Sequence, residues 1–239
     1  MDGTLLIDRS RLPSHVGLIM DGNGRWARKR NLIRTQGHKE GLNAAKRVVQ
    51  TASDLGLRYL TLFTFSTENW KRAVEEVGFL MGLIKDFLVS ELDFYRANKI
   101  RIRHAGDIEG LPEDIAEEIR KVVADTANFD GLTVILAINY GGRDELARAV
   151  RKIVRSGMPA ETVDEHAISS MLDNPDVGDP DLVIRTAGER RLSNFLLWES
   201  AYAEFHFSDT LWPDWTGEDL IAAIADFQNR DRRFGGVKQ

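Results

Sequence analysis

Short apolar runs alternate with longer amphipathic stretches along almost the whole chain. Six runs rich in β-branched and aromatic residues predict strands, at residues 16–20, 59–65, 100–103, 132–138, 182–185 and 204–207. Apolar positions spaced as on one face of a helix predict helices at residues 38–55, 74–98, 112–128, 143–156, 166–172 and 216–230. This alternation predicts an α/β fold with a central, mostly parallel, six-stranded sheet flanked by helices.

Composition narrows the class of protein further. The chain has 239 residues, of which 43% are hydrophobic and 29% charged, so a single domain over residues 1–239 is expected. A formal net charge of −5 argues against general nucleic-acid binding. Cysteine is absent, which excludes disulfides, cysteine-ligated zinc and a thiol nucleophile. Neither a targeting segment nor a membrane-spanning run is visible, and we expect a cytoplasmic protein.

The loops after four of the predicted strands share glycine, asparagine, serine and arginine. They comprise residues 21–26, 66–72, 139–143 and 186–194. In a parallel sheet these loops lie at the same edge, which is where α/β proteins bind ligands. Glycine-rich turns expose backbone N–H groups to phosphate oxygens, and arginines donate further hydrogen bonds to them. The sequence therefore predicts a site for a phosphorylated ligand at this edge.

More arginines occur near these loops than one diphosphate requires. The candidates are Arg25, Arg28, Arg34, Arg72, Arg185, Arg190 and Arg191, with His38 nearby in the sequence. The surplus indicates two phosphorylated groups or one large one. For any single arginine a weak surface ion pair is an equally good interpretation. The clustering in post-strand loops favours phosphate binding for the set.

The first post-strand loop allows two interpretations of Asp21. Its carboxylate could hold Mg²⁺ against a phosphate, or it could cap the turn, and spacing leaves both open. The loop lacks the ligand pattern of an EF-hand and the Gly-Lys-Ser/Thr of a Walker A loop. Gly22, Gly24 and Ala27 match a dinucleotide fingerprint only weakly. A dinucleotide-binding fold places an acidic residue at the end of the second strand, about 20 residues after the glycine loop. In this chain the first acidic residue at the end of the next predicted strand is Glu68, which is too far along the sequence.

The predicted helix at residues 74–98 is apolar around most of its circumference. Such a helix is buried between layers or lines an apolar cavity, and ordinary core packing is the more frequent case. Gly78 and Gly82 weaken its interior by about 1 kcal/mol each relative to alanine, so we expect them to allow a close approach. A phosphate site beside an apolar helix would suit an isoprenoid diphosphate.

Six ordered motifs together are highly specific. They are HVGLIMDGNGRWA (15–27), GH (37–38), FSTENWKR (65–72), NYGGR (139–143), DLVIRT (181–186) and GERRLSNF (188–195). Over residues 15–236 the chain closely resembles the cis-prenyltransferases, in particular the bacterial enzymes that make undecaprenyl diphosphate. The resemblance implies a homodimer with an apolar product tunnel. It also implies consecutive Mg²⁺-dependent cis-condensations of isopentenyl diphosphate onto farnesyl diphosphate.

The resemblance assigns roles to individual residues. Asp21 is the catalytic carboxylate that engages Mg²⁺, Glu204 is a second acid linked to the metal, and Asn69 takes part in proton removal. Asparagine is a poor base, so a diphosphate oxygen could take the proton instead. Residues 233–235 are implied to reach the neighbouring subunit's site. The residues implied to bind substrate are Gly22, Asn23, Gly24, Arg25, Trp26, Arg34, His38, Ser66, Thr67, Glu68, Trp70, Arg72, Arg185, Arg191, Leu192 and Ser193.

Product length follows from two features of the resemblance. Thr64 is small, and no extra segment separates Trp70 from Gly106. Both favour a medium-length product such as undecaprenyl diphosphate for a cell-wall lipid carrier, with a short-chain synthase as the alternative. Release of such a product implies a transient contact with a membrane surface.

Three rivals of a different class are weaker. The all-α trans-prenyltransferases need aspartate-rich motifs, and no adjacent Asp-Asp pair occurs here. A non-catalytic partner subunit would lack the phosphate loop and the Asn-Trp segment, which are complete in this chain. A dinucleotide-binding oxidoreductase is disfavoured by the spacing after the first loop.

Overall fold

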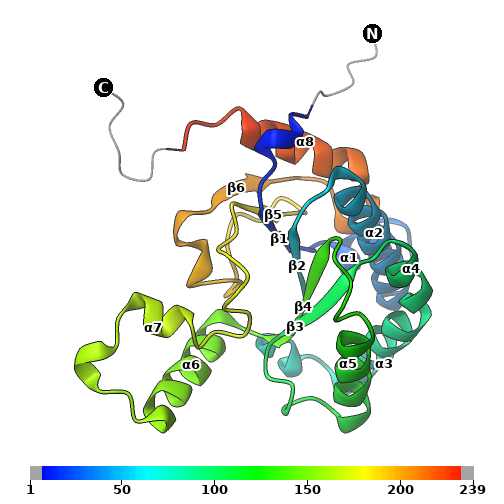
Figure 1. Cartoon of the computed structure of the whole chain (residues 1–239). Helices are drawn as coiled ribbons and strands as arrows, with labels where there is room; N and C mark the ends of the chain where they lie inside the picture. Colours follow the sequence, from blue (N-terminus) through cyan, green and yellow to red (C-terminus); the bar gives the residue numbers. More distant parts are fainter. Residues whose placement is uncertain (1–6, 233–239) are drawn as a thin grey trace.

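Six parallel strands form one sheet in a computed structural model that describes residues 7–232. The strand order is β3-β4-β2-β1-β5-β6 (Figure 1). The strands are β1 (His15–Ile19), β2 (Tyr59–Ser66), β3 (Arg101–Ala105), β4 (Thr133–Tyr140), β5 (Leu182–Arg185) and β6 (Glu204–Phe207). Every pairing is parallel. The predicted six-stranded sheet is therefore confirmed, and the four polar loops follow its four central strands.

Eight α-helices surround the sheet within the described residues. They are α1 (Asn23–Lys29), α2 (Arg34–Leu55), α3 (Val74–Ser90), α4 (Leu92–Ala97), α5 (Glu113–Asp125), α6 (Gly142–Ser156), α7 (Glu165–Ser169) and α8 (Gly217–Gln228). Thr216 caps α8 as its spacing to Asp219 suggests, since each side chain accepts a hydrogen bond from the other's backbone N–H. Across residues 7–232, no helix is both long and apolar enough to cross a bilayer.

The sequence did not predict α1, and α2 begins four residues earlier than expected. Both differences arise where the two helices pack together. A Cβ at Gly37 would lie 2.2 Å from the carbonyl oxygen of Asn23, and one at Gly41 would lie 2.5 Å from its Oδ1. The first two turns of α2 therefore approach the start of α1 within backbone contact. Tertiary packing of this kind stabilises a helix that is too short to form alone.

The single helix expected at residues 74–98 is two helices, separated at Glu91. No proline or glycine lies at the break, so helix propensity gave no sign of it in the sequence. Lys46 on α2 pairs with the Glu91 carboxylate at 2.7 Å, and Tyr95 is buried in the core. We expected Gly78 and Gly82 to allow another segment to approach the helix closely. This was wrong, because a Cβ at either position would meet nothing within 4 Å.

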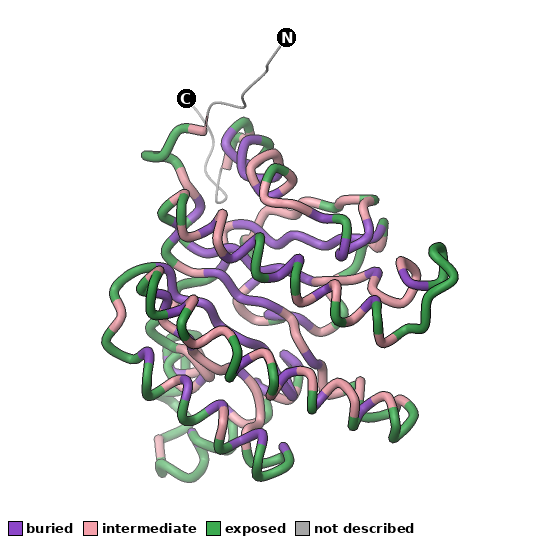
Figure 2. Tube along the Cα trace, turned by 90° about the vertical axis from the view of Figure 1, so that its right-hand side faces the viewer, coloured by how far each residue is buried: buried purple, intermediate pink, exposed green. Residues whose placement is uncertain are grey.

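Two apolar clusters cover the two faces of the sheet. The larger cluster packs α2, α3, α5 and α8 against one face through residues such as Leu18, Leu62 and Ile138. The smaller one, around Ile135 and Phe195, lies on the other face beneath loops and α6. The strands β1, β4 and β5 are buried along their whole length, and Figure 2 shows helices that alternate between buried and exposed positions. The strands' carboxyl ends are thus held rigidly by packing on both sides.

The pairing of β2 with β4 is irregular near the carboxyl end of both strands. The register passes from Phe63 opposite Ala137 to Phe65 opposite Ile138, which leaves Thr64 as an extra residue on β2. It is restored when Ser66 pairs with Tyr140, which leaves Asn139 as the extra residue on β4. Asn139 has a positive φ of 52°. Such bulges redirect side chains and are frequent beside active sites.

A buried carboxyl pair lies behind the second face of the sheet. Burial raises the pKa of Glu199 to about 8, and the neighbouring Glu145 carboxylate contributes to the same shift. Glu145 itself accepts hydrogen bonds from the Tyr140 hydroxyl and from the backbone N–H of Asp173. Glu199 is therefore protonated in the native state at neutral pH.

The glycine contacts predict opposite effects of the same substitution. Gly78→Ala should raise the free energy of unfolding by about 1 kcal/mol, because alanine is the better helix former and meets no neighbour. Gly37→Ala gains the same propensity but forces α1 away from α2, so it should lower stability. Chemical denaturation of both variants checks this, and a Gly37→Ala variant as stable as the wild type would contradict the packing.

Replacement of Glu199 should change how stability depends on pH. The unfolded carboxyl ionises from about pH 4.3 upward, whereas the native one keeps its proton until about pH 8. Ionisation therefore favours the unfolded state increasingly between these values. Glu199→Gln should be more stable than the wild type by a margin that widens over that pH window and is constant above it. Parallel stability curves for the two proteins in urea would disprove the raised pKa.

Candidate active site

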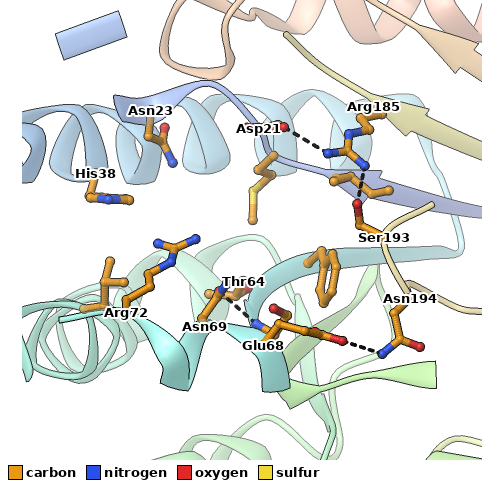
Figure 3. A pocket seen from close by; sticks show the side chains of 15 residues that line it. Asp21, Asn23, His38, Thr64, Glu68, Asn69, Arg72, Arg185, Ser193 and Asn194 are labelled. Atoms are coloured by element: carbon orange, nitrogen blue, oxygen red, sulfur yellow. Dashed lines mark hydrogen bonds and ion pairs between the residues drawn. The ribbon is translucent and has the colours of Figure 1, made fainter. Parts of the chain in front are cut away.

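A cavity of about 580 Å³ opens at the carboxyl ends of β1, β2 and β5. Its polar walls come from five segments that are far apart in the sequence (Figure 3). Arg185 and Ser193 lie on one side, and Asn69 and Arg72 on the other. The lining residues are Ile19, Met20, Asp21, Asn23, His38, Phe63, Thr64, Ser66, Glu68, Asn69, Arg72, Leu80, Arg185, Ser193 and Asn194.

A second cavity of about 470 Å³ adjoins the first and shares Asp21 with it. Three arginines, Arg25, Arg28 and Arg34, dominate its walls. The lining residues are Asp21, Gly22, Gly24, Arg25, Arg28, Leu32 and Arg34. Gly22 adopts a φ of +114°, which strains any other residue, and a Cβ there would also lie 3.0 Å from that of Ala187. Two cavities that each contain arginines therefore meet at one carboxylate.

Asp21 lies at the tip of β1 and ties three segments together. Its Oδ2 accepts a hydrogen bond from Nη2 of Arg185 at 3.0 Å, and its Oδ1 lies 3.6 Å from Nη2 of Arg25. The Arg185 side chain is only 5% exposed, and its other Nη donates to Ser193 Oγ at 2.7 Å. A buried guanidinium requires such a partner, because an unpaired buried charge is costly. Asp21 itself is one-third exposed and faces both cavities.

A second charged cluster joins α2 to the start of α3. The Glu76 carboxylate lies 2.9 Å from Arg72 and 3.3 Å from Arg34. Nε2 of His38 is 3.9 Å from the same carboxylate and is buried without a hydrogen-bond partner. Burial, and then the charges of Arg34 and Arg72, lower the pKa of His38 to about 4. His38 is therefore neutral at physiological pH, and its ring can donate to an anion without adding a charge.

The turn that carries Asn69 is a 3₁₀ helix over Thr67–Lys71. The Asn69 Oδ1 accepts a hydrogen bond from the backbone N–H of Ser66 at 3.1 Å. Glu68 accepts one from Asn194 at 2.8 Å, which links this turn to the loop after β5. The Trp70 indole donates to Asn139 Oδ1 at 2.7 Å. The turn is thus attached to the end of β4 and to the loop after β5.

Apolar space continues from the main cavity between α2 and α3. A cavity of about 70 Å³ and another of about 30 Å³ share Met20, Leu42, Ala45, Thr64 and Ile84. The bulge in β2 places Thr64 in the lining of the main cavity and of both apolar ones. The apolar surface of α3 therefore serves a cavity as well as the core.

The structure brings most of the predicted site residues together. Nine of them line the main cavity, namely Asp21, Asn23, His38, Ser66, Glu68, Asn69, Arg72, Arg185 and Ser193. Gly22, Gly24, Arg25 and Arg34 line the second one. The predicted residues outside both linings are Trp26, Thr67, Trp70, Arg191, Leu192 and Glu204. Trp26 donates to Asp214 at 2.6 Å, and Arg191 pairs with Glu189.

Within one chain, Glu204 does not join Asp21. Glu204 is the first residue of β6 and aligns with Leu182, whereas Asp21 lies beyond the other end of these strands. Its carboxylate pairs with Arg230 at 2.9 Å. Residues 233–235, implied to reach a neighbouring subunit, lie outside the described residues.

Sequence reasoning missed several lining residues. Asn194 could have been found, because it lies in a post-strand loop beside Ser193. Leu80 lies on the helix already flagged as apolar, but periodicity does not show which of its positions face a cavity. Ile19, Met20 and Phe63 are ordinary strand residues in sequence, and only the closing of the sheet edge places them in the site.

The Asp21 carboxylate, where the two cavities meet, is suited to binding one Mg²⁺ ion. Mg²⁺ is held by one or two carboxylates together with substrate phosphates. Asp21 supplies an accessible carboxylate between two arginine-lined cavities. Among residues 7–232, no three His, Cys, Asp or Glu side chains come together to hold a metal without substrate. The donor set therefore suits a metal that arrives with a phosphorylated ligand.

Known proteins resemble this chain over nearly its whole length. A family model described as "Putative undecaprenyl diphosphate synthase" matches residues 19–235. The isoprenyl transferase of Treponema denticola is 54% identical over 223 residues, covering 93% of this chain and 97% of that protein. The isoprenyl transferase of Thermotoga maritima is 48% identical over 229 residues, covering 95% and 98%.

Two solved structures share the fold. Lavandulyl diphosphate synthase from Lavandula x intermedia, in complex with dimethylallyl diphosphate, has a TM-score of 0.90 and 36% identity, over 95% of this chain and 99% of that one. A probable undecaprenyl diphosphate synthase from Campylobacter jejuni has a TM-score of 0.80 and 34% identity, over 93% and 98%. The chain therefore belongs to the undecaprenyl diphosphate synthase family and is a prenyltransferase enzyme.

Proposed function

We propose that the enzyme condenses isopentenyl diphosphate with an allylic diphosphate such as farnesyl diphosphate, repeatedly and with cis geometry. The observation that carries this proposal is the meeting of two arginine-lined cavities at Asp21, with apolar space leading off between α2 and α3. In each condensation the allylic C–O bond breaks, a C–C bond forms and one proton leaves the isopentenyl unit.

The allylic diphosphate occupies the cavity of Arg25, Arg28 and Arg34. Arginines stabilise the negative charge that develops on a departing diphosphate. Gly22 and Gly24 leave the backbone of this loop open to its oxygens. Asn23 Oδ1 and His38 Nε2 are two buried atoms without partners, and both residues line the main cavity and the apolar cavity of about 70 Å³.

The isopentenyl diphosphate occupies the side of the main cavity formed by the loop after β5. Arg185 and Ser193 line it, and the Arg185 guanidinium is held in place by Asp21 and by the carbonyl of Arg191. The Arg191 side chain is exposed and pairs with Glu189, so it must exchange that partner for a phosphate. The two diphosphates therefore approach Asp21 from opposite sides.

Asn69 lies across the cavity from Arg185 (Figure 3). Its Oδ1 is engaged with the backbone of Ser66, which fixes the side chain but weakens it as a proton acceptor. We therefore assign Asn69 to orienting the isopentenyl unit, and the proton to a diphosphate oxygen. Positioning of this kind lowers the barrier without a strong base.

Asp21, together with phosphate oxygens, would hold Mg²⁺, which would neutralise charge on the leaving diphosphate. A role for Glu204 at that metal would require a site formed with a second subunit, because within one chain the two carboxylates lie at opposite ends of the strands.

Exposed apolar side chains beside β6 and on α6 support a homodimer. Tyr202 and Phe207 are 69% and 39% exposed beside β6, which forms an edge of the sheet. Val150 and Val154 are exposed on α6. Apolar groups on a sheet edge favour association. We also propose that the enzyme is cytoplasmic. With its product bound, it makes a transient contact with a membrane.

Two product lengths are compatible with the cavities. Thr64 leaves the passage between α2 and α3 open, which favours a medium-length product such as undecaprenyl diphosphate. The apolar cavities measure only about 70 and 30 Å³, which favours the alternative, a short-chain synthase, unless α3 moves outward. Phe87 and Leu88 line the narrower of the two.

Replacement of Asp21 tests the proposed reaction centre. Asp21→Asn removes the charge that meets both cavities and leaves the buried Arg185 guanidinium with a neutral acceptor, so the variant should be less stable than the wild type, and its activity is measured at a temperature where circular dichroism shows it folded. Incorporation of radiolabelled isopentenyl diphosphate should fall about 100-fold or more. Retention of most activity by the variant, with an unchanged Mg²⁺ dependence, would remove Asp21 from the metal site.

Replacement of Thr64 tests the route of the growing chain. Thr64→Leu adds volume where three cavities meet, so it should shorten the products. Thr64→Val is the matched control, because it loses the hydroxyl but keeps the volume. Chain lengths are compared on reversed-phase plates, and an unchanged distribution for Thr64→Leu would show that the chain takes another path.

A further inference from the structure

The side chain of Trp70 points away from the substrate cavities. Trp70 is absent from the lining of both, although Glu68, Asn69 and Arg72 on either side of it line the main one. Its ring packs edge-on against Phe65, with the centroids 5.1 Å apart. Its indole N–H is directed to the end of β4. A substrate contact therefore does not explain this tryptophan.

Asn139 accepts the hydrogen bond from the indole, and three hydrogen bonds hold Asn139 in place. Its Oδ1 accepts from Trp70 Nε1 at 2.7 Å, and its Nδ2 donates to the carbonyl of Asp107 at 2.8 Å. The backbone N–H of Asp107 donates in turn to the Asn139 carbonyl at 3.1 Å. The side chain is enclosed, since a Cβ at Gly110 would lie 2.7 Å from Nδ2. Asn139 is 5% exposed, and both polar atoms of its amide are satisfied.

The backbone at Asn139 is also unusual. It is the extra residue of the β4 bulge and has a φ of 52°, in the left-handed region that asparagine tolerates better than most residues. The bulge turns its side chain from the sheet toward the Thr67–Lys71 turn. The irregularity in β4 thus has a definite consequence, which is a fixed acceptor for Trp70.

We propose that Asn139 is a positioning residue that acts through Trp70 to hold Asn69 and Arg72 in the substrate cavity. The Trp70–Asn139 hydrogen bond attaches the turn to the β4 strand, and the Glu68–Asn194 bond attaches it separately to the loop after β5. Loss of the Asn139 acceptor lets the turn rotate, so Asn69 no longer faces the bound isopentenyl unit. This inference rests on the proposed function, and neither Trp70 nor Asn139 contacts substrate in it.

The variants separate this role from general stability. Asn139→Gly removes the amide but accepts the positive φ, and Trp70→Phe removes the indole N–H but keeps the ring against Phe65. Each should lower kcat/KM about tenfold, mainly through kcat, as expected for one well-placed hydrogen bond. Because both break the same contact, the double variant should also lose about tenfold, whereas independent effects would multiply to about 100-fold.

Two further variants serve as controls. Asn139→Asp keeps an acceptor for Trp70 but loses the donor to Asp107, so its activity should lie closer to the wild type than that of Asn139→Gly. Thr126→Val removes a buried hydrogen bond to Ile102, 3.0 Å long and outside the site. It should lower the melting temperature without changing kcat or KM.

A spectroscopic readout tests the contact without relying on turnover. The indole N–H of Trp70, assigned by its loss in Trp70→Phe, should exchange slowly with solvent in the wild type and quickly in Asn139→Gly. Equal protection in both proteins overturns the proposal, and so do multiplicative losses in the double variant. Inactive wild-type protein would overturn the proposed function and this inference together. Active wild type with unimpaired variants would overturn the inference alone.

Discussion

The ion pair between Asp21 and Arg185 is the interaction on which the site depends. Arg185 ends β5 with its side chain almost fully buried, and Asp21 lies just beyond the end of the neighbouring strand β1. A buried guanidinium must be paired, so the two loops cannot separate without a large cost. The same carboxylate remains accessible from two cavities that contain arginines. One contact thus joins the site's two halves and leaves a charge available to its ligands.

The two walls of the site are held in different ways. The loops after β1 and β5 are fixed by backbone bonds, such as the one from Trp212 to the Asp21 carbonyl, and by the Thr186 hydroxyl. The opposite wall is α3, whose exposed Gly78 and Gly82 meet no neighbours. The proposed elongation of an apolar chain would need a fixed diphosphate end and a wall that can give way.

The sequence was sufficient for the sheet, the post-strand loops and most of the polar residues of the site. This follows from physics that is local in the chain, because apolar periodicity marks strands and a parallel sheet gathers their carboxyl ends at one edge. It was insufficient where tertiary contacts decide. The helix α1, the break at Glu91 and the outward direction of Trp26 and Trp70 depend on partners distant in sequence. The two bulges that place Thr64 and Asn139 also left no periodic signal, since each only shifts a register by one residue.

Incorporation of radiolabelled isopentenyl diphosphate by the wild-type protein tests the proposed repeated cis-condensation. Farnesyl diphosphate is the primer, Mg²⁺ is present or chelated, and products are resolved by chain length. If the enzyme carries out this reaction, the products form a Mg²⁺-dependent ladder of cis-prenyl diphosphates that ends at a defined length. A folded protein that binds both diphosphates but joins none of them would contradict it.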